Sequence, residues 1–375
     1  MGLLAVLGLI AIAWLPLPFG RLGQADFFPY WTASYVLVNG GDPYSTAALD
    51  EAFRAVRPVE YAATEPVFRP PWALGPPWTL LLVAPLGWLP FEVAARLWLL
   101  VSILLIGGSA LMLWPQVFKG KPLTPLFVAL SFVPTLIVIT LGQIAVLVLV
   151  GLVICVGALQ TRRDDWAGVG LLLMLSKPQL MYLAAPSILI WAAWRGRWGV
   201  WRGAVVALIL SLGVLSVLLP DGLTSYLRFA QSYDFFRHAA ATIGGVVRAY
   251  WHTDALRWLG VLAVPLLPWL VRLIDRVGIW TGVNAALLIA LPLALYGWNY
   301  DHIVLIPAIL QAVIWAGRAT DRQRRWLLAL LAAIYGLLFV MRLRGIGEFL
   351  YVWVPIAVGI WYARAYQLTH ARLPD

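Results

Sequence analysis

The stretch Pro90–Trp114 decides the fold class, because it reads PFEVAARLWLLVSILLIGGSALMLW and holds only two charged residues. A helix that crosses a membrane needs roughly 20 mostly apolar residues, so this stretch is long enough for one span. Similar runs recur along the 375 residues, of which 62% are hydrophobic and only 12% charged. A soluble globule carries about a quarter charged residues, so the composition excludes a soluble enzyme, a disordered chain and a DNA-binding domain. We therefore predict an all-α, polytopic integral membrane protein.

The apolar runs predict about 12 membrane helices, counting one short hairpin, in a single domain over residues 1–375. The first, Gly2–Pro18, has no charged n-region, so we expect a retained helix rather than a signal peptide. The run 77–89 is too short to span and is bounded by prolines. Further spans are expected near residues 90–114, 123–141, 144–160, 203–219, 255–271, 278–296, 303–317, 326–341 and 350–363.

Three segments between these runs should have special forms. Residues 19–76 are polar and acidic, and predict a long outer loop with two amphipathic helices, near 29–39 and 46–56. Read as one helix, residues 166–194 would be overlong and broken at a proline, so we expect a hairpin of two short helices that meets at Ser176-Lys177-Pro178-Gln179. Residues 220–253 predict a second outer loop.

The distribution of charge predicts the orientation. With the N-terminus in the cytoplasm, the cytoplasmic loops hold 15 basic and five acidic residues, an excess equal to the whole net charge of +10. Those basic residues are Lys119, Lys121, Arg162, Arg163, Arg195, Arg197, Arg202, Arg272, Arg276, Arg318, Arg322, Arg324, Arg325, Arg364 and Arg372. The positive-inside rule expects such an excess of basic residues on the cytoplasmic side, and we predict a multi-pass protein of the plasma (inner) membrane. The long first loop, the hairpin tip, the 220–253 loop and residues 298–302 then lie on the outer side.

Asp26 is the first candidate for chemistry, in the segment Gln24-Ala25-Asp26-Phe27-Phe28-Pro29-Tyr30-Trp31. A carboxylate at the membrane surface, among aromatic rings, suits a general base that takes a proton from a hydroxyl in a partly dry pocket. The alternative is that Asp26 only caps the following helix, since Asp is a favoured N-cap residue.

Lys177 is the second candidate, because it is one of only three lysines and lies inside an apolar hairpin. An ionisable residue at membrane depth is costly and indicates a partner, such as a phosphate at headgroup level. The alternative is that the side chain snorkels to the nearest interface.

The turn Tyr296-Gly297-Trp298-Asn299-Tyr300-Asp301-His302 and a few polar residues complete the candidates. His302 suits donation to a phosphate, and Asp301 suits orienting it or binding sugar hydroxyls; a structural histidine is the alternative. Gln143 follows Gly142 in a tight turn between two spans, and Arg69 precedes a double proline. No spacing matches a metal site, and no phosphate-binding loop or zinc-protease motif occurs.

Taken in order, these pieces resemble glycosyltransferase family 87. Its members are membrane enzymes of the C-type (GT-C) fold that use polyprenyl-phosphate sugars, including mannosyl- and arabinofuranosyltransferases. The resemblance lies in Asp26–Trp31 with Gly40-Gly41-Asp42-Pro43-Tyr44, in the proline-punctuated run from Pro76-Pro77-Trp78 to Leu97-Trp98, in Gly142-Gln143 with Lys177-Pro178, and in Trp298–His302.

The resemblance implies an inverting glycosyltransferase with Asp26 as its catalytic base. For such a reaction the residues themselves suggest donor-phosphate contacts from Lys177, His302 and Arg69, and sugar or acceptor contacts from Tyr30, Trp31, Asp42, Gln143, Gln179 and Asp301. The expected donor is a polyprenyl-phosphate sugar, with mannose as the sugar, and the expected acceptor is an envelope glycolipid or polysaccharide. No cofactor, no metal and no nucleic acid is expected, and membrane lipids are the other partners.

Two other functions fit the composition. A transporter or flippase would move a lipid-linked sugar without chemistry, and would favour inverted repeats that the two halves of this sequence do not show. An assembly subunit of an envelope complex would have dispensable carboxylates, so tolerance of Asp26→Ala would favour it.

Overall fold

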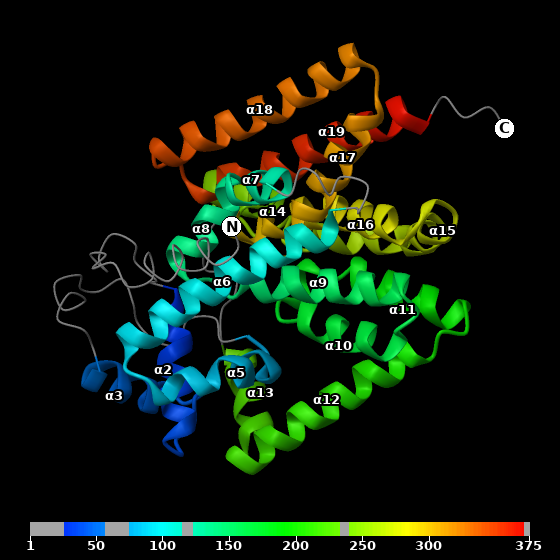
Figure 1. Ribbon diagram of the computed structural model, residues 1–375. Helices are drawn as coiled ribbons and strands as arrows, with labels where there is room; N and C mark the ends of the chain where they lie inside the picture. Colours follow the sequence, from blue (N-terminus) through cyan, green and yellow to red (C-terminus); the bar gives the residue numbers. More distant parts are fainter. Residues whose placement is uncertain (1–25, 57–74, 115–122, 233–239, 371–375) are drawn as a thin grey trace. The chain divides into compact units, whose positions relative to one another are not determined.

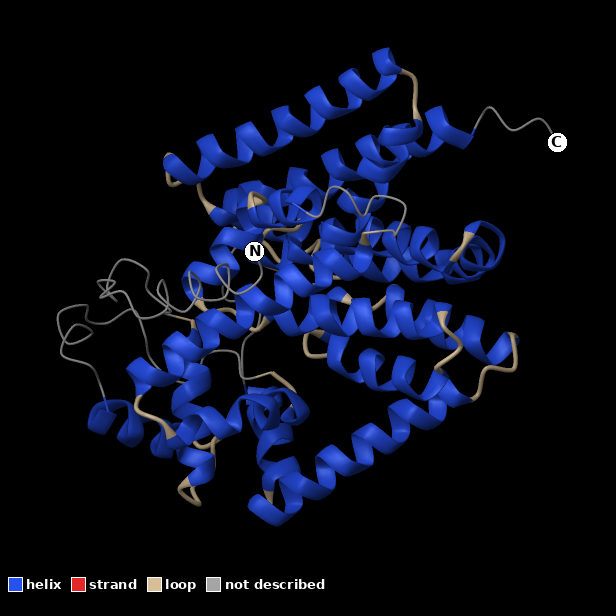
Figure 2. Ribbon diagram, in the orientation of Figure 1, coloured by secondary structure: helices blue, strands red, loops and turns tan. Residues whose placement is uncertain are grey.

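The computed structural model describes residues 26–56, 75–114, 123–232 and 240–370. Every regular element in these residues is a helix, and none of them forms a strand (Figures 1 and 2). The all-α prediction is thus confirmed for the described part. The expected first helix Gly2–Pro18 and the candidate Arg69 lie outside the described residues.

The chain divides into two compact units. Unit 1 comprises Met1–Leu105, Ile137–Val146 and Val205–Phe235. Unit 2 comprises Ile106–Leu136, Leu147–Ala204 and Phe236–Asp375. The expectation that they act as one domain stays a prediction.

Within the described residues, four helices are long and apolar enough to cross a membrane. They are α6 (Phe91–Leu113), α12 (Gly199–Leu218), Asn299–Arg318, which joins the 3-10 helix η5 (Asn299–Leu305) to α17 (Ile306–Arg318), and α18 (Asp321–Leu343). A bent pair, α7 (Leu123–Leu130) and α8 (Val133–Leu141), raises the number to five if it is one span. The protein is therefore a multi-pass membrane protein, and the count of about 12 membrane helices stays a prediction.

Two expected spans are interrupted. The run 123–141 bends by 72° between α7 and α8. Pro134, at the second position of α8, has no N–H and its ring clashes with the carbonyl four residues earlier, so a straight helix cannot continue through it. The run 255–271 consists of the 3-10 helix η4 (Leu259–Leu266), which contains Pro265, followed by α15 (Leu267–Val277). In both places the apolar pattern is right and the prolines set the break.

The core of unit 1 is α2 (Phe27–Val38), of which nine of 12 residues are buried. The prediction of an amphipathic helix here is wrong, because α2 packs against α3 (Thr46–Val56), α5 (Pro77–Val83) and the 3-10 helix η1 (Ala84–Trp88). A Cβ on Gly87 of η1 would lie 2.5 Å from the backbone of Ser34, so only glycine allows this close approach.

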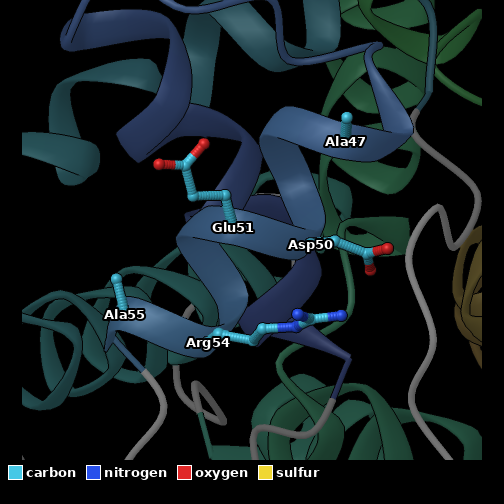
Figure 3. A pocket seen from close by; sticks show the side chains of 5 residues that line it. All are labelled: Ala47, Asp50, Glu51, Arg54 and Ala55. Carbon is cyan, nitrogen blue, oxygen red and sulfur yellow. The ribbon is translucent and has the colours of Figure 1, made fainter.

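Helix α3 does have two faces, as expected. Leu49 and Ala52 are buried, whereas its other face is open and lines a surface hollow with Ala47, Asp50, Glu51, Arg54 and Ala55 (Figure 3). All five residues come from one helix, and none is a candidate site residue.

In unit 2, α9 (Ala145–Gln160) and α10 (Asp164–Met174) lie side by side (Figure 1). A Cβ on Gly151 of α9 would lie 2.3 Å from the backbone nitrogen of Met174, so the two helices touch through their backbones. Helix α10 ends before Lys177, and α11 (Ala184–Trp194) follows after the short 3-10 helix η3 (Pro178–Leu180). The predicted division of residues 166–194 into two short helices is what the structure has.

Ion pairs connect the start of α10 and the end of α11 with neighbouring segments. Three arginines that follow α11 pair with aspartates: Arg195 with Asp275, Arg197 with Asp164 and Arg202 with Asp165. The pairs of Arg197 and Arg202 link the segment after α11 and the start of α12 to the start of α10, and the pair of Arg195 links the end of α11 to α15.

The rest of unit 2 includes α14 (Ile243–Trp251), α16 (Ile279–Leu293), η6 (Glu348–Val352) and α19 (Trp353–His370). Unit 1 further includes α13 (Gly222–Ser232), which contacts α5.

Candidate functional site

Asp26 stands at the start of α2 and is held by the turn that joins α8 to α9. Its backbone N–H donates to the carbonyl of Leu141 at 3.0 Å, and its carboxylate Oδ2 accepts from Nε2 of Gln143 at 2.5 Å. Asp26 occupies the N-cap position, but its side chain accepts no capping hydrogen bond. The alternative that Asp26 only caps the helix is therefore wrong.

The turn that carries Gln143 has a backbone conformation suited to glycine and contacts α6. Gly142 has a positive φ of 70°, a conformation that glycine adopts without strain, and its carbonyl accepts from the indole N–H of Trp98 at 2.8 Å. The ring of Trp98 stacks on that of Phe27, with ring centroids 5.5 Å apart. These contacts connect the start of α2, the N-terminal half of α6 and the turn inside unit 1.

The side-chain amide nitrogen of Gln143 is hydrogen-bonded, whereas its oxygen has no partner within the described residues. Its Nε2 must face Asp26, because an amide oxygen would repel the carboxylate, so the bond fixes the orientation of the amide. The side chain is only 4% exposed, and Oε1 has no hydrogen-bond partner within the described residues. A buried orphan acceptor is costly, so Oε1 is available to a hydroxyl group of a ligand.

Lys177 lies in unit 2, at the break between α10 and α11, and its side chain is 10% exposed. Its ammonium donates to Oδ1 of Asp301 at 2.6 Å and lies 4.6 Å from the centre of the Tyr300 ring. The alternative of a snorkelling lysine is wrong, because the charge is buried and paired. The sequence predicted that this charge needs a partner and suggested a phosphate; the partner among the described residues is Asp301, and the phosphate contact stays a prediction.

Asp301 is fixed by its own turn. Its carboxylate is 1% exposed, and Oδ2 accepts from the backbone N–H of Trp298 at 2.9 Å. The carbonyl of Gly297, just before the turn, accepts from the N–H of Ala241 at 2.7 Å. Trp298 and Tyr300 stack with ring centroids 6.3 Å apart. These contacts fix the position of the Asp301 carboxylate within the turn 297–301.

His302 and Asn299 lie in the same turn, on η5, and both are 2% exposed. Nδ1 of His302 and Oδ1 of Asn299 have no hydrogen-bond partner within the described residues. Buried polar atoms are nearly always satisfied, so these two indicate a ligand or water that completes them. Sequence reasoning singled out His302 and missed Asn299, whose only signal is its place in the same turn, two residues before Asp301.

Two of the remaining candidates, Trp31 and Tyr30, lie in the packed core of unit 1. Trp31 is 3% exposed and donates its indole N–H to the carbonyls of Leu86 and Leu89, both at 3.1 Å. Tyr30 is 6% exposed within the same core. Gln179 is half-buried in η3, close in sequence to Lys177. Packing accounts for Trp31 and Tyr30, and the sugar contacts expected of all three stay predictions.

Asp42 shapes the turn after α2, since its Oδ1 accepts from the N–H of Tyr44 at 2.8 Å. Tyr44 packs against Tyr226 and Phe229, and its buried hydroxyl has no partner within the described residues. Burial, with Tyr226 and Asp42 nearby, raises the pKa of Tyr44 above its usual range, so the hydroxyl stays protonated. Tyr44 is a second residue whose polar atom sequence reasoning did not single out.

Ionisable side chains inside a membrane protein are costly and are indications of a functional site. Among the described residues, unit 1 holds the Asp26–Gln143 pair, and unit 2 holds the Lys177–Asp301 pair, with His302 next to Asp301 in the chain. Within the described ranges, no three His, Cys, Asp or Glu side chains gather closely enough to hold a metal ion. The class defined by these features is a multi-pass membrane protein with preformed acid, amide and cation groups in its interior.

Residues 73–343 of the chain match glycosyltransferase family 87. This match covers well over half of the sequence, so the chain belongs to that family and is a glycosyltransferase. Gln143, Lys177 and the 298–302 turn lie inside the match, and Asp26 lies before it. No curated protein and no solved structure matches the chain.

Proposed function

We propose that this glycosyltransferase moves a mannose residue from a polyprenyl-phosphate donor to a hydroxyl of an envelope glycolipid or polysaccharide, with inversion at the anomeric carbon. The reaction takes place at the outer face of the plasma membrane, with the N-terminus in the cytoplasm. The observation that carries the proposal is the carboxylate of Asp26, held at 2.5 Å by the Gln143 amide at the start of α2.

Asp26 acts as the general base. The acceptor hydroxyl gives its proton to the carboxylate while its oxygen attacks the anomeric carbon of the donor sugar. The bond between that carbon and the phosphate oxygen breaks, its electron pair leaves with the polyprenyl phosphate, and the configuration inverts. An amide N–H that donates to the carboxylate supports this role, because it favours the ionised form and fixes its direction.

Lys177 and His302 stabilise the charge that develops on the leaving phosphate. Fixed donors in a water-poor site are the groups that lower the barrier of such a step. The buried ammonium of Lys177 and the unsatisfied Nδ1 of His302 support this assignment. Arg69 is a third expected phosphate contact and lies outside the described residues. A lipid phosphate brings no diphosphate to neutralise, so we expect the reaction to need no metal.

The acceptor and the donor sugar meet the remaining polar groups. Oε1 of Gln143 accepts a hydroxyl close to the base, which its lack of a protein partner supports. The other sugar or acceptor contacts in this proposal are Tyr30, Trp31, Asp42, Gln179 and Asp301.

The test is transfer of radiolabelled mannose from polyprenyl-phosphate mannose in membranes that contain the full chain, with EDTA present. Asp26→Asn keeps the size of the side chain but cannot accept the proton, so transfer should fall by about 100-fold or more, the typical effect of losing a general base. Asp50→Asn is the matched control, because Asp50 lies on the open face of α3 (Figure 3) and should leave transfer unchanged.

Transfer by the wild type that is lost only in Asp26→Asn supports the mechanism. Equal transfer by both removes Asp26 as the base. If the wild type transfers only arabinofuranose, the sugar is wrong and the mechanism stands. A wild type that moves the lipid-linked sugar across vesicles without forming a new glycosidic bond would instead establish a flippase.

A further inference from the structure

We infer that Asp301 is a positioning residue which holds the Lys177 ammonium in a neutral pair and thereby limits how tightly Lys177 binds a lipid phosphate. The inference rests on the proposed function, in which Lys177 meets the phosphate of the donor. It adds a second task for the 297–301 turn: control of the affinity for the phosphate that leaves.

The Lys177 ammonium has donors to spare. It carries three N–H groups, and within the described residues only one of them has a hydrogen-bond acceptor, Oδ1 of Asp301 at 2.6 Å. The Tyr300 ring lies 4.6 Å away and stabilises the cation without accepting a conventional hydrogen bond. With the side chain 10% exposed, water reaches little of it. The remaining N–H groups are thus suited to a ligand with oxygen acceptors.

Asp301 is the fixed partner of the pair and Lys177 the mobile one. The Asp301 carboxylate is anchored through Oδ2 to the Trp298 N–H, and the turn is anchored through Gly297 to Ala241. Lys177 reaches the carboxylate through a flexible four-carbon stem. A phosphate that approaches the ammonium must therefore compete with a carboxylate that does not move.

This competition acts differently on substrate and product. The donor is a phosphodiester with one negative charge, whereas the released polyprenyl phosphate is a monoester with a charge between one and two at neutral pH. An ammonium that is already neutralised attracts the donor weakly, and attracts the phosphate more strongly as charge develops on it. Such a preference for the developing charge favours catalysis over tight binding of the ground state. The Asp301 charge then also keeps the product from binding too tightly to leave.

The experiment measures how strongly decyl phosphate, a single-chain phosphate monoester, binds to the purified full chain in detergent, by calorimetry and by the shift in melting midpoint. The variants are Asp301→Asn, Lys177→Met and the double variant. Asp301→Asn should bind decyl phosphate about tenfold more tightly than the wild type, which is within the coupling range of contacting charged groups. The gain should vanish in the double variant. Asp275→Asn is the matched control, since it removes the partner of Arg195 and should not change the affinity.

Asp301→Asn leaves a buried ammonium without its partner, so the variant will be less stable than the wild type. Its melting midpoint should then rise more on addition of decyl phosphate than that of the wild type, which keeps the test valid for a destabilised variant. Decanol, which has the chain and no phosphate, should give no such rise. Inorganic phosphate should bind more weakly than decyl phosphate, and equal affinities would overturn the assignment to a lipid phosphate.

Two results overturn the inference, and they differ. If the wild type binds decyl phosphate through Lys177 and Asp301→Asn binds it no better, Asp301 does not limit the affinity, while the proposed function stands. If Lys177→Met binds decyl phosphate as well as the wild type does, Lys177 is not a phosphate contact, and its role in the proposed function fails with the inference. In transfer assays, Asp301→Asn should lower KM for the donor and lower kcat, because the product leaves slowly.

Discussion

Replacement of Gln143 by leucine tests how far the base depends on the amide beside it. The substitution removes the Nε2 donor, which lies 2.5 Å from the Asp26 carboxylate, and keeps a buried side chain of similar length. A hydrogen bond to a charged group contributes about 1.5–3 kcal/mol. If this whole free energy stabilises the ionised and correctly oriented carboxylate in the transition state, its loss should lower kcat/KM by about 10- to 150-fold.

The effect on stability should be much smaller than the effect on rate. Leucine also removes Oε1, a buried oxygen without a protein partner, so part of the lost hydrogen bond is offset. The assay is mannose transfer in membranes, together with the melting midpoint of the purified protein. Gln231→Leu is the control, because Gln231 is an exposed glutamine in α13 of the same unit. Unchanged transfer in Gln143→Leu would refute the reasoning, and so would a loss of transfer that merely follows a loss of folded protein.

Two further predictions concern stability. Gly203→Ala should destabilise the protein by about 1–3 kcal/mol, because the new Cβ would lie 2.1 Å from the carbonyl oxygen of Asp165. Gly213→Ala is the control, because Gly213 is in the same helix and its new Cβ would have nothing within 4 Å, so this variant should not lower the melting midpoint. Equal melting midpoints of the two variants would contradict the prediction. The hydrogen bond from Arg195 holds the pKa of Asp275 below its ordinary value of 3.8, so the pair stabilises the protein above that pH and the stabilisation is lost as the pH falls through the lowered pKa. The melting midpoint of Asp275→Asn should therefore lie below that of the wild type at pH 7 and approach it at lower pH, and a constant difference at every pH would exclude this cause.

The sequence predicts the long spans well. The helices expected near 90–114, 203–219, 303–317 and 326–341 are confirmed, because an apolar run of that length has few alternatives in a membrane. The failures have local causes. Pro134 and Pro265 interrupt runs whose composition alone looks continuous. The prediction of an amphipathic helix at α2 failed because it relied on the polar residues around the helix. The residues of the helix itself, FFPYWTASYVLV, are mostly apolar.

The sequence indicated which residues belong to the candidate site, but not which of them contact one another. Asp26 and Lys177 stand out because a charge among apolar residues is costly. Their partners, Gln143 and Asp301, lie 117 and 124 positions further along the chain. Helical periodicity carries information over a few turns only, so no local pattern joins residues so far apart. Unsatisfied atoms, such as Nδ1 of His302, depend on three-dimensional burial and have no signal in a single sequence.

The span Asn299–Arg318 differs from the other three in a way that bears on biosynthesis. Its mean hydropathy is 1.4 and 78% of its apolar window is buried by protein, against 2.0–2.1 and 17–28% for α6, α12 and α18. A segment with Asp301 near one end gains little from partition into lipid on its own. We therefore expect the translocon to release it late, once helices such as α16 and α19 can receive it. Lys177 emerges from the ribosome 124 residues before its countercharge, so the nascent chain must tolerate the ammonium without Asp301 until about the last fifth of synthesis.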